Sequence, residues 1–266
     1  MKIVSIGAGN LSTHLSKALQ NAGFEMVQIF SRTDTTAKEL AGLLQASYTT
    51  DIGNIVCDAS VYIISVSDDA IEYLCERLPL TNGLAVHTAG SVSMDVFAGR
   101  FINYGVMYPL QTFSKLRPVD FQEVPVFIEA NTDDNLQTLR KVAEAISRQV
   151  YEASSAERMK LHLAAVFGCN FVNHLYLLSA QIAQQAGFDF NVLSPLILET
   201  TYKAMVSENP KEVQTGPAVR NDRKVMQKHI EMLASHPEWQ EIYAMLSANI
   251  RKVKNEEQVN RRVFYP

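Results

Sequence analysis

The residues with the clearest chemical capacity lie near the start of the chain. The apolar run Ile3–Ile6 precedes a glycine-containing loop and then a helix-like stretch. The loop reads Gly7-Ala8-Gly9-Asn10-Leu11-Ser12. Its spacing, G-x-G-x-x-S, is that of a dinucleotide-binding fingerprint in which serine replaces the third glycine. Because the loop follows a strand and opens a helix, it predicts a site that binds a pyrophosphate.

The individual positions of this loop have distinct roles in such a site. Gly7 permits the tight turn, and Gly9, which has no side chain, lets the backbone approach the pyrophosphate. The backbone N–H groups after Asn10 would face the anion. The third glycine serves helix–strand packing, so Ser12 is compatible with binding, and its hydroxyl could hydrogen-bond a phosphate. The alternative is an ordinary tight turn between a strand and a helix.

The end of the second predicted strand indicates which cofactor is bound. Sites that prefer NAD carry Asp or Glu about 20 residues after the loop, where the carboxylate accepts hydrogen bonds from the ribose 2′-OH. Here the strand ends in Ser31-Arg32-Thr33 and carries no carboxylate at its tip. An arginine with flanking hydroxyls suits the dianionic 2′-phosphate of NADP. We therefore expect NADP (NADPH) as the cofactor; the alternative for Arg32 is a solvated loop charge.

Two further loops follow predicted strands. In open α/β sheets, ligands bind outside the carboxyl ends of the strands. We expect Gly90 to allow a close approach on the nicotinamide side, or else to lie in an ordinary turn. The other residues of these loops that we expect to contact the cofactor are Val66, Ser67, Thr88 and Ala89.

Candidates for catalysis lie in the second half of the chain. On one helix, His162 and Asn170 would be about 80° apart and Asn170 and His174 about 40° apart, so the three could share a broad face. We expect His162 to donate a proton near neutral pH and Asn170 to hydrogen-bond a substrate carbonyl. Arg220 could bind a substrate carboxylate or phosphate. The alternatives are polar pairing across a domain or dimer interface, and a structural Arg220–Asp222 pair.

The elements that must position these residues change character along the chain. In the first part, strands alternate with helices, which predicts a Rossmann-type, doubly wound and mostly parallel sheet. Helices alone are expected after it, so we predict a dinucleotide-binding domain at 1–152 and an all-helical substrate and dimerisation domain at 153–266. The expected strands are 3–6, 25–31, 60–66, 84–88, 104–108, 124–129 and 149–152. The expected helices are 11–22, 35–44, 68–78, 136–147, 154–187, 194–209, 220–234 and 237–254.

Composition excludes several classes of function. The 266 residues are 47% hydrophobic and 20% charged, with a net charge of −4, which gives no basic surface for nucleic acid. Three separated cysteines without a C-x-x-C favour a reducing, cytoplasmic location. The histidines show no metal-ligand spacing, so no metal site is expected.

One apolar segment needs comparison with a membrane span. The segment 161–183 carries no Asp, Glu, Lys or Arg and is long enough to cross a bilayer. It contains polar side chains that are costly in lipid, among them Asn170, Asn173 and Gln181. We therefore expect no membrane contact and a buried central helix of a globular domain.

The sequence also resembles a known superfamily. The loop Ile6–Leu11, the tip Ser31-Arg32-Thr33 and the following helical domain resemble the 6-phosphogluconate dehydrogenase-like reductases, which include pyrroline-5-carboxylate reductase and the β-hydroxyacid dehydrogenases. The chain is most similar to a bacterial group labelled as NADP oxidoreductases, with a Rossmann-like domain and a C-terminal helical domain of unknown function. The stretches that carry this resemblance are 86–91, 108–113, 162–170 and 215–222.

Two departures limit what the resemblance implies. The group commonly has His-Pro where this chain has Tyr108-Pro109, which puts a catalytic role for that position in doubt. The β-hydroxyacid dehydrogenases have a lysine four residues before an asparagine, and here Val166 stands four residues before Asn170. Their mechanism is therefore not transferred as a whole.

Together these observations predict an NADP(H)-dependent oxidoreductase that transfers hydride to or from a small carbonyl or imine substrate. We expect a homodimer that forms through the long apolar helix. Two alternatives remain open: an NADP(H)-binding sensor without turnover, and hydride exchange between NADP and a deazaflavin. The substrate and the direction of the reaction are not encoded in a recognisable motif.

Overall fold

The computed structural model describes residues 1–264, with side chains described through residue 255. The chain forms two compact units, of which the first is Met1–Val172 and the second begins at Asn173. We expected the boundary after residue 152, where the sheet does end. The first unit extends about one helix further because contacts described below fasten the next helix to the sheet.

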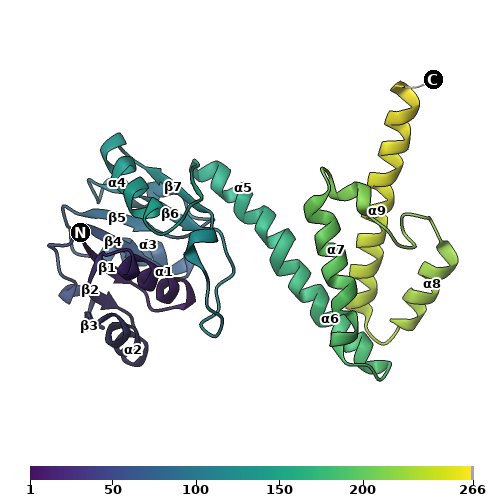
Figure 1. Ribbon diagram of the computed structural model, residues 1–266, viewed down its shortest axis with the longest axis horizontal. Helices are drawn as coiled ribbons and strands as arrows, with labels where there is room; N and C mark the ends of the chain where they lie inside the picture. The colour runs from purple at the N-terminus through teal and green to yellow at the C-terminus, as the bar shows by residue number, and fades with distance from the viewer. Residues whose placement is uncertain (265–266) are drawn as a thin grey trace. The chain divides into compact units, whose positions relative to one another are not determined.

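The first unit is built on one eight-stranded sheet (Figure 1). The strand order is β3-β2-β1-β4-β5-β6-β7-β8, which contains the Rossmann order 3-2-1-4-5-6. Neighbouring strands are parallel except β6 and β7, so the prediction of a mostly parallel, doubly wound sheet is confirmed. The strands are β1 (Lys2–Ile6), β2 (Glu25–Phe30), β3 (Ser47–Thr49), β4 (Val61–Ile64), β5 (Leu84–His87), β6 (Tyr104–Pro109), β7 (Val126–Ala130) and β8 (Val150–Glu152).

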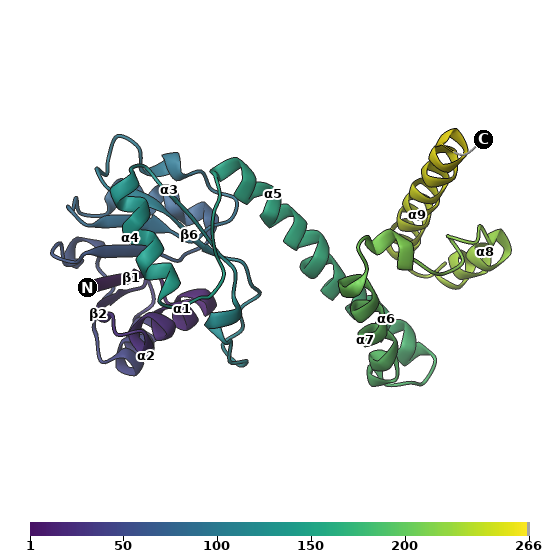
Figure 2. The same ribbon diagram turned by 45° about the horizontal axis from the view of Figure 1, so that its top comes forward.

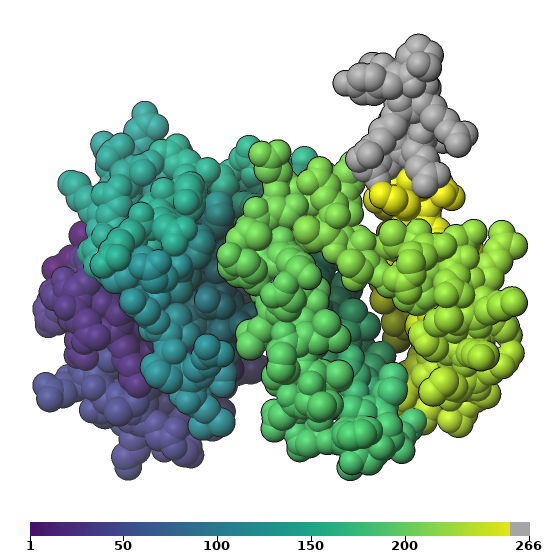
Figure 3. Space-filling view, turned by 45° about the vertical axis from the view of Figure 1, so that its right-hand side comes forward, coloured from purple at the N-terminus to yellow at the C-terminus, as the bar shows by residue number. Residues whose placement is uncertain are grey.

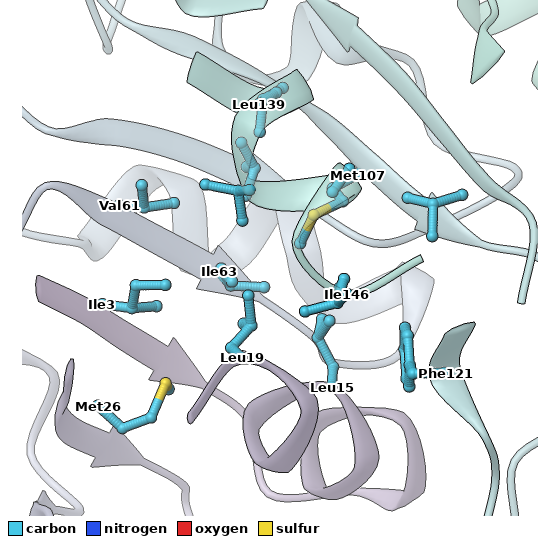
Figure 4. Close-up of a cluster of buried hydrophobic side chains, with 14 of the residues drawn as sticks. Ile3, Leu15, Leu19, Met26, Val61, Ile63, Met107, Phe121, Leu139 and Ile146 are labelled. Atoms are coloured by element: carbon cyan, nitrogen blue, oxygen red, sulfur yellow. The ribbon is translucent and has the colours of Figure 1, made fainter. Parts of the chain in front are cut away.

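Helices cover both faces of this sheet (Figures 1 and 2). Helices α1 (Asn10–Asn21), α2 (Asp34–Leu44) and α4 (Asp133–Glu144) pack on one face, and α3 (Asp68–Arg77) packs on the other. The central strands are buried on both sides, as in β4, and therefore read as continuous apolar runs. Figure 4 shows one core cluster, in which Ile3 and Ile63 of the sheet meet Leu15 and Leu19 of α1.

The first helix after the sheet has a strong start signal. Helix α5 (Ser155–Ala165) begins at a capping box, in which the Ser154 hydroxyl accepts from the Glu157 N–H and the Glu157 carboxylate accepts from the Ser154 N–H. The helix continues through residue 185, but Val166–Phe171 (η4) is a π-helix. A π-helix bonds i→i+5 and holds an extra residue per turn. The angles expected for a regular helix therefore do not apply between His162 and Asn170.

The second unit consists of helices within its described residues. They are α6 (Val172–Gln185, which starts one residue before the unit), α7 (Ser194–Val206), α8 (Arg223–Met232) and α9 (Pro237–Phe264). Gly187 follows α6 with φ +81°, a conformation that glycine adopts easily, and so ends this helix as expected. In the space-filling view, the green segment that contains α7 lies on the surface of this unit (Figure 3).

The prediction of a buried central helix is wrong for the single chain. The helix Ser155–Gln185 is long and apolar enough to cross a membrane by length and composition, and 6% of its most apolar window is buried. Within residues 173–255, the buried apolar side chains are Leu178, Ala218 and Met226. A helix that is apolar on all sides needs other groups to bury its side chains, but its composition does not show that the same chain provides them.

Candidate functional site

The predicted cofactor residues all lie at one edge of the sheet. The strands β1, β2, β4 and β5 are parallel, so their carboxyl ends share this edge. The strand order reverses between β1 and β4, and ligands bind beside such switch points in open α/β sheets. The predicted residues brought to this edge are Gly7 to Ser12 after β1, Ser31 to Thr33 after β2, Val66 and Ser67 after β4, and Thr88 to Gly90 after β5.

The loop after β1 has the geometry of a pyrophosphate cradle. Gly7 has φ +121°, and a Cβ there would lie 2.2 Å from the carbonyl oxygen of Ser65, so glycine is required. A Cβ on Gly9 would meet no atom of the described chain within 4 Å, which leaves open space above this backbone. The first N–H groups of α1 have no acceptor within the helix, so they can bind an anion there. These residues fit the pyrophosphate of a dinucleotide.

Ser12 contributes to the loop from inside the fold. Its hydroxyl donates to the Gly7 carbonyl oxygen at 2.6 Å and lies 2.9 Å from the Ser5 hydroxyl. The side chain is buried, so this hydroxyl supports the turn at Gly7 rather than facing the open space. Contact of Ser12 with the cofactor stays a prediction for its backbone N–H group alone.

The tip of β2 presents a cation to solvent. Arg32 is exposed and forms no ion pair with another residue whose side chain the structure describes. Ser31 beside it accepts a hydrogen bond from the Thr33 N–H at 3.3 Å and lies 3.0 Å from the Thr36 hydroxyl, so the tip is held in a defined turn. A guanidinium on an ordered turn of this kind suits a phosphate ligand.

A second tightly constrained glycine at this edge is Gly90. A Cβ on this residue would lie 2.7 Å from Cζ of Tyr108 and 2.8 Å from Nδ1 of His162. The Tyr108 Oη is itself 3.1 Å from His162 Nδ1, with the rings edge to face. The residue pair therefore sits directly against the loop where we expected the nicotinamide. His162 was predicted for catalysis, whereas a catalytic role for Tyr108 was in doubt because the resembling group commonly has histidine there.

The surroundings of Tyr108 keep its phenol protonated. Burial raises the pKa of Tyr108, and the negative charge of Asp68 raises it further, while the Arg158 cation acts in the opposite direction. Asp68 also accepts a hydrogen bond from the Ser91 hydroxyl, next to Gly90. A neutral phenol can donate to His162 Nδ1 or to a ligand, so Tyr108 and His162 together can hold a transferable proton.

His87 supports the same loop from within the core. It is fully buried, its Nδ1 accepts from the Ala89 N–H at 3.2 Å, and its Nε2 lies 3.4 Å from the Ser93 carbonyl oxygen. Burial lowers the pKa of His87 to about 4, and the nearby Arg158 acts in the same direction. His87 is therefore neutral near pH 7 and holds the loop rather than exchanging protons.

The other two predicted catalytic residues lie on other elements of the chain. Asn170 lies on the π-helix and is exposed. Arg220 is exposed in the second unit, and Asp222 caps α8 through the Val225 N–H instead of pairing with Arg220. The missed signals were an i, i+4 spacing of Arg158 and His162 on α5 and the position of Tyr108 near the end of a central strand.

Comparison with known proteins gives a consistent result. The family model described as NADP oxidoreductase coenzyme F420-dependent matches residues 2–89, and a domain of unknown function, DUF2520, matches residues 124–250. The crystal structure of a putative NADP oxidoreductase from Bacteroides fragilis is 46% identical in sequence, over 94% of this chain and 98% of that chain, with a TM-score of 0.87. A comparison with curated proteins finds no match.

More distant structures share the fold. Pyrroline-5-carboxylate reductase from Streptococcus pyogenes is 13% identical over 95% of this chain and 98% of that chain, with a TM-score of 0.62. An imine reductase from Myxococcus stipitatus, in complex with NADP+, is 15% identical over 96% of this chain and 93% of that chain, with a TM-score of 0.63. At these identities the likeness concerns the fold alone.

Substitution by alanine should have different effects at Gly7 and at Gly9. Gly9→Ala adds a methyl group in open space, so the melting temperature should stay close to that of the wild type. The affinity for NADPH should fall at least about tenfold, because the methyl group occupies the space through which the pyrophosphate approaches the backbone. Gly7→Ala should destabilise the fold by about 2 kcal/mol or more, because of its φ and the contact with Ser65. Thermal unfolding and NADPH fluorescence titration measure both effects. Unchanged NADPH affinity in Gly9→Ala would contradict the assignment of the loop.

Proposed function

Because the chain belongs to the family of NADP oxidoreductases that join a coenzyme F420-dependent-type domain to a DUF2520 domain, we propose that it transfers hydride between NADP(H) and a small carbonyl or imine substrate. The observation that carries the proposal is the Tyr108–His162 pair against Gly90. It lies at the same sheet edge as the open pyrophosphate loop.

The reaction assigns separate tasks to these residues. NADPH, when bound, supplies the hydride. Reduction of a C=N or C=O bond also requires one proton at the nitrogen or oxygen. Tyr108 holds such a proton at its Oη, since burial and Asp68 raise its pKa, and donates it to the nitrogen or oxygen of the substrate. In the tautomer protonated at Nδ1, His162 then returns a proton from Nδ1 to Oη, while its Nε2 takes one from water. Gly90 lets the phenol and the imidazole meet over its backbone, because a Cβ at this position would overlap both side chains.

The imine class is favoured within this proposal. The structural neighbours include proteins named as imine reductases and pyrroline-5-carboxylate reductases. A neutral proton donor suits an imine because its nitrogen is basic and accepts a proton readily. Hydride exchange with a deazaflavin is the second candidate, since the matched family model is described as coenzyme F420-dependent.

Turnover tests the proposed function directly. NADPH oxidation is measured with 1-pyrroline, 1-pyrroline-5-carboxylate and pyruvate, and NADPH-dependent reduction is measured with coenzyme F420. Tyr108→Phe and His162→Gln should each lower kcat about 100-fold, as expected for loss of general acid catalysis, with NADPH affinity unchanged. Tyr151→Phe is the matched control, because Tyr151 is an exposed tyrosine of β8.

Each alternative gives a different result. NADPH binding without turnover of any of these compounds would contradict an enzyme and support a sensor. Turnover of F420 alone would support the deazaflavin reaction. Full activity of both Tyr108→Phe and His162→Gln would contradict the assignment of the proton donor.

We further propose that Arg32 reads the 2′-phosphate and makes NADPH the preferred cofactor. Removing a charged hydrogen-bond donor to a phosphate costs about 1.5–3 kcal/mol, so Arg32→Ala should weaken NADPH binding about 10- to 100-fold. NADH binding should change less than about threefold because NADH lacks this phosphate. Arg77→Ala is the control, since Arg77 is a half-exposed arginine at the far end of α3. Equal losses for both cofactors, measured by fluorescence titration, would contradict this role.

We also propose that a second copy of the chain covers the exposed apolar helices. Few residues of the second unit are buried, and a unit of this size needs a larger core to be stable. Polar side chains such as Asn170, Asn173 and Gln181 make lipid a poor cover for the long helix. The large side chains that are exposed on α5 to α7 are Met159, Leu163, Phe167, Phe171, Leu177, Ile182, Leu196, Leu198, Tyr202, Met205 and Val206.

The oligomeric state tests this surface. Sedimentation equilibrium in detergent-free buffer should give twice the chain mass of 29.7 kDa. Leu196→Glu and Met205→Glu should shift the protein to monomers or make it insoluble, because both side chains would lie at the interface. Leu116→Glu is the control, since Leu116 is exposed in the first unit. A stable wild-type monomer at micromolar concentration, or a need for detergent, would contradict the dimer.

A further inference from the structure

A buried arginine near the start of α5 contacts the Gly90 loop on both sides. Arg158 is 1% exposed. Its Nε donates to the Ala89 carbonyl oxygen at 3.2 Å and one terminal nitrogen donates to the Val92 carbonyl oxygen at 2.5 Å. These acceptors flank Gly90 in the sequence. A single planar guanidinium therefore fixes the loop to the helix.

Glu129 on β7 completes this arrangement. Its carboxylate accepts from Arg158 at 2.5 Å, from the Ser155 N–H at 2.9 Å and from the Ser155 hydroxyl at 2.7 Å. The Ser155 hydroxyl oxygen also accepts from the Met94 N–H at 3.0 Å. The strand, the first turn of α5 and the loop after β5 are thus joined by one hydrogen-bond network.

The network lies one helical turn from His162. Residues 158 and 162 are i and i+4 on α5, so their side chains occupy the same face of the helix. Arg158 holds the backbone on either side of Gly90, and His162 lies against Gly90 itself. A shift of Arg158 would therefore change the distance from His162 to both Gly90 and Tyr108.

A gain in stability does not by itself explain why the Arg158–Glu129 ion pair is buried. A buried arginine–carboxylate pair is often no more stabilising than well-packed apolar side chains of the same volume. The donors of Arg158, however, have fixed directions, and its acceptors lie on two separate segments: Ala89 and Val92 in the loop after β5, and Glu129 on β7. Directional contacts of this kind set distances that apolar packing leaves free to vary.

We propose that Arg158, held by Glu129, is the positioning residue of the Tyr108–His162 pair, fixing the pair against the Gly90 loop at the distance that proton transfer requires. The catalytic meaning of this geometry rests on the proposed function, whereas the geometry itself can be tested without a substrate. The Arg158 cation also opposes Asp68 in its effect on the pKa of Tyr108, so it acts on the pair by charge as well as by position.

The experiment compares Arg158→Lys and Glu129→Gln with a matched ion-pair variant. Lysine keeps the charge but cannot reach three acceptors at once, and glutamine keeps the shape of Glu129 but loses its charge. The control is Arg140→Lys, because Arg140 pairs with Glu152 on the surface of the same unit. All measurements are made on the full chain, well below the melting temperature of each variant.

The first readout is the NMR signal of the His162 ring, assigned with His162→Gln. In the wild type and in Arg140→Lys we expect one sharp set of His162 signals. In Arg158→Lys and Glu129→Gln these signals should move to the positions found in Tyr108→Phe, or broaden, because the pair is no longer held. Unchanged His162 signals in both variants would overturn the proposal, even if their melting temperatures fall, since that is the result of a merely structural role.

The second readout is steady-state turnover of the imine probe 1-pyrroline with NADPH. Both variants should lose kcat by about 100-fold, with KM and NADPH affinity changed less than about threefold, because a misplacement near 1 Å has this effect on rate. Wild-type kcat in both variants would overturn the proposal. If the wild type turns over neither 1-pyrroline nor the other two carbonyl and imine probes, the proposed function fails, and the His162 signals alone decide whether Arg158 positions the pair.

Discussion

The lack of a side chain at Gly90 is the constraint on which the candidate site depends. Tyr108 and His162 come from a strand and a helix that are 54 residues apart, and they meet because the backbone between them carries no Cβ. Any larger residue would overlap Cζ of Tyr108 and Nδ1 of His162. The same close approach brings the phenol and the imidazole within 3.1 Å of each other, as the proposed proton transfer requires. Packing and chemistry therefore impose the same requirement on this position.

The contacts around Gly90 also determine where the sheet-containing unit ends. Arg158 and Glu129 fasten the start of α5 to β7 and to the loop after β5, and His162 adds a further contact one turn later. The helix is thus part of the first unit through Val172, although it belongs by sequence to the helical half. The side chain of His162 on this helix therefore has a defined place at the edge of the sheet.

Local sequence patterns were sufficient for most of the fold and for the turn at Gly7. Alternating strands and helices, the Gly7 turn and the Ser154–Glu157 capping box depend on neighbours within a few residues, and all three are confirmed. The exposed three-residue strand β3 and the antiparallel pairing of β7 with β6 were missed. A strand of three half-polar residues has little periodicity, and strand direction depends on the path of the connecting loop, which has no local signature.

The candidate site was predictable only in part, for related physical reasons. His162 was identified because histidine titrates near neutral pH, whereas a catalytic role for Tyr108 was in doubt. The contact between these two residues, which are distant in sequence, depends on the close approach at Gly90. The π-helix at Val166–Phe171 changes the rotation of the helix, so Asn170 could not be placed by counting residues. The long helix was expected to be buried because its composition demands cover, and composition does not specify which molecule supplies it. A site such as the Tyr108–His162 contact is assembled from separate parts of the chain, whereas a dinucleotide fingerprint such as Gly7 to Ser12 lies within a few consecutive residues at the end of one strand. This difference explains why the cofactor can be inferred from short motifs and the substrate cannot.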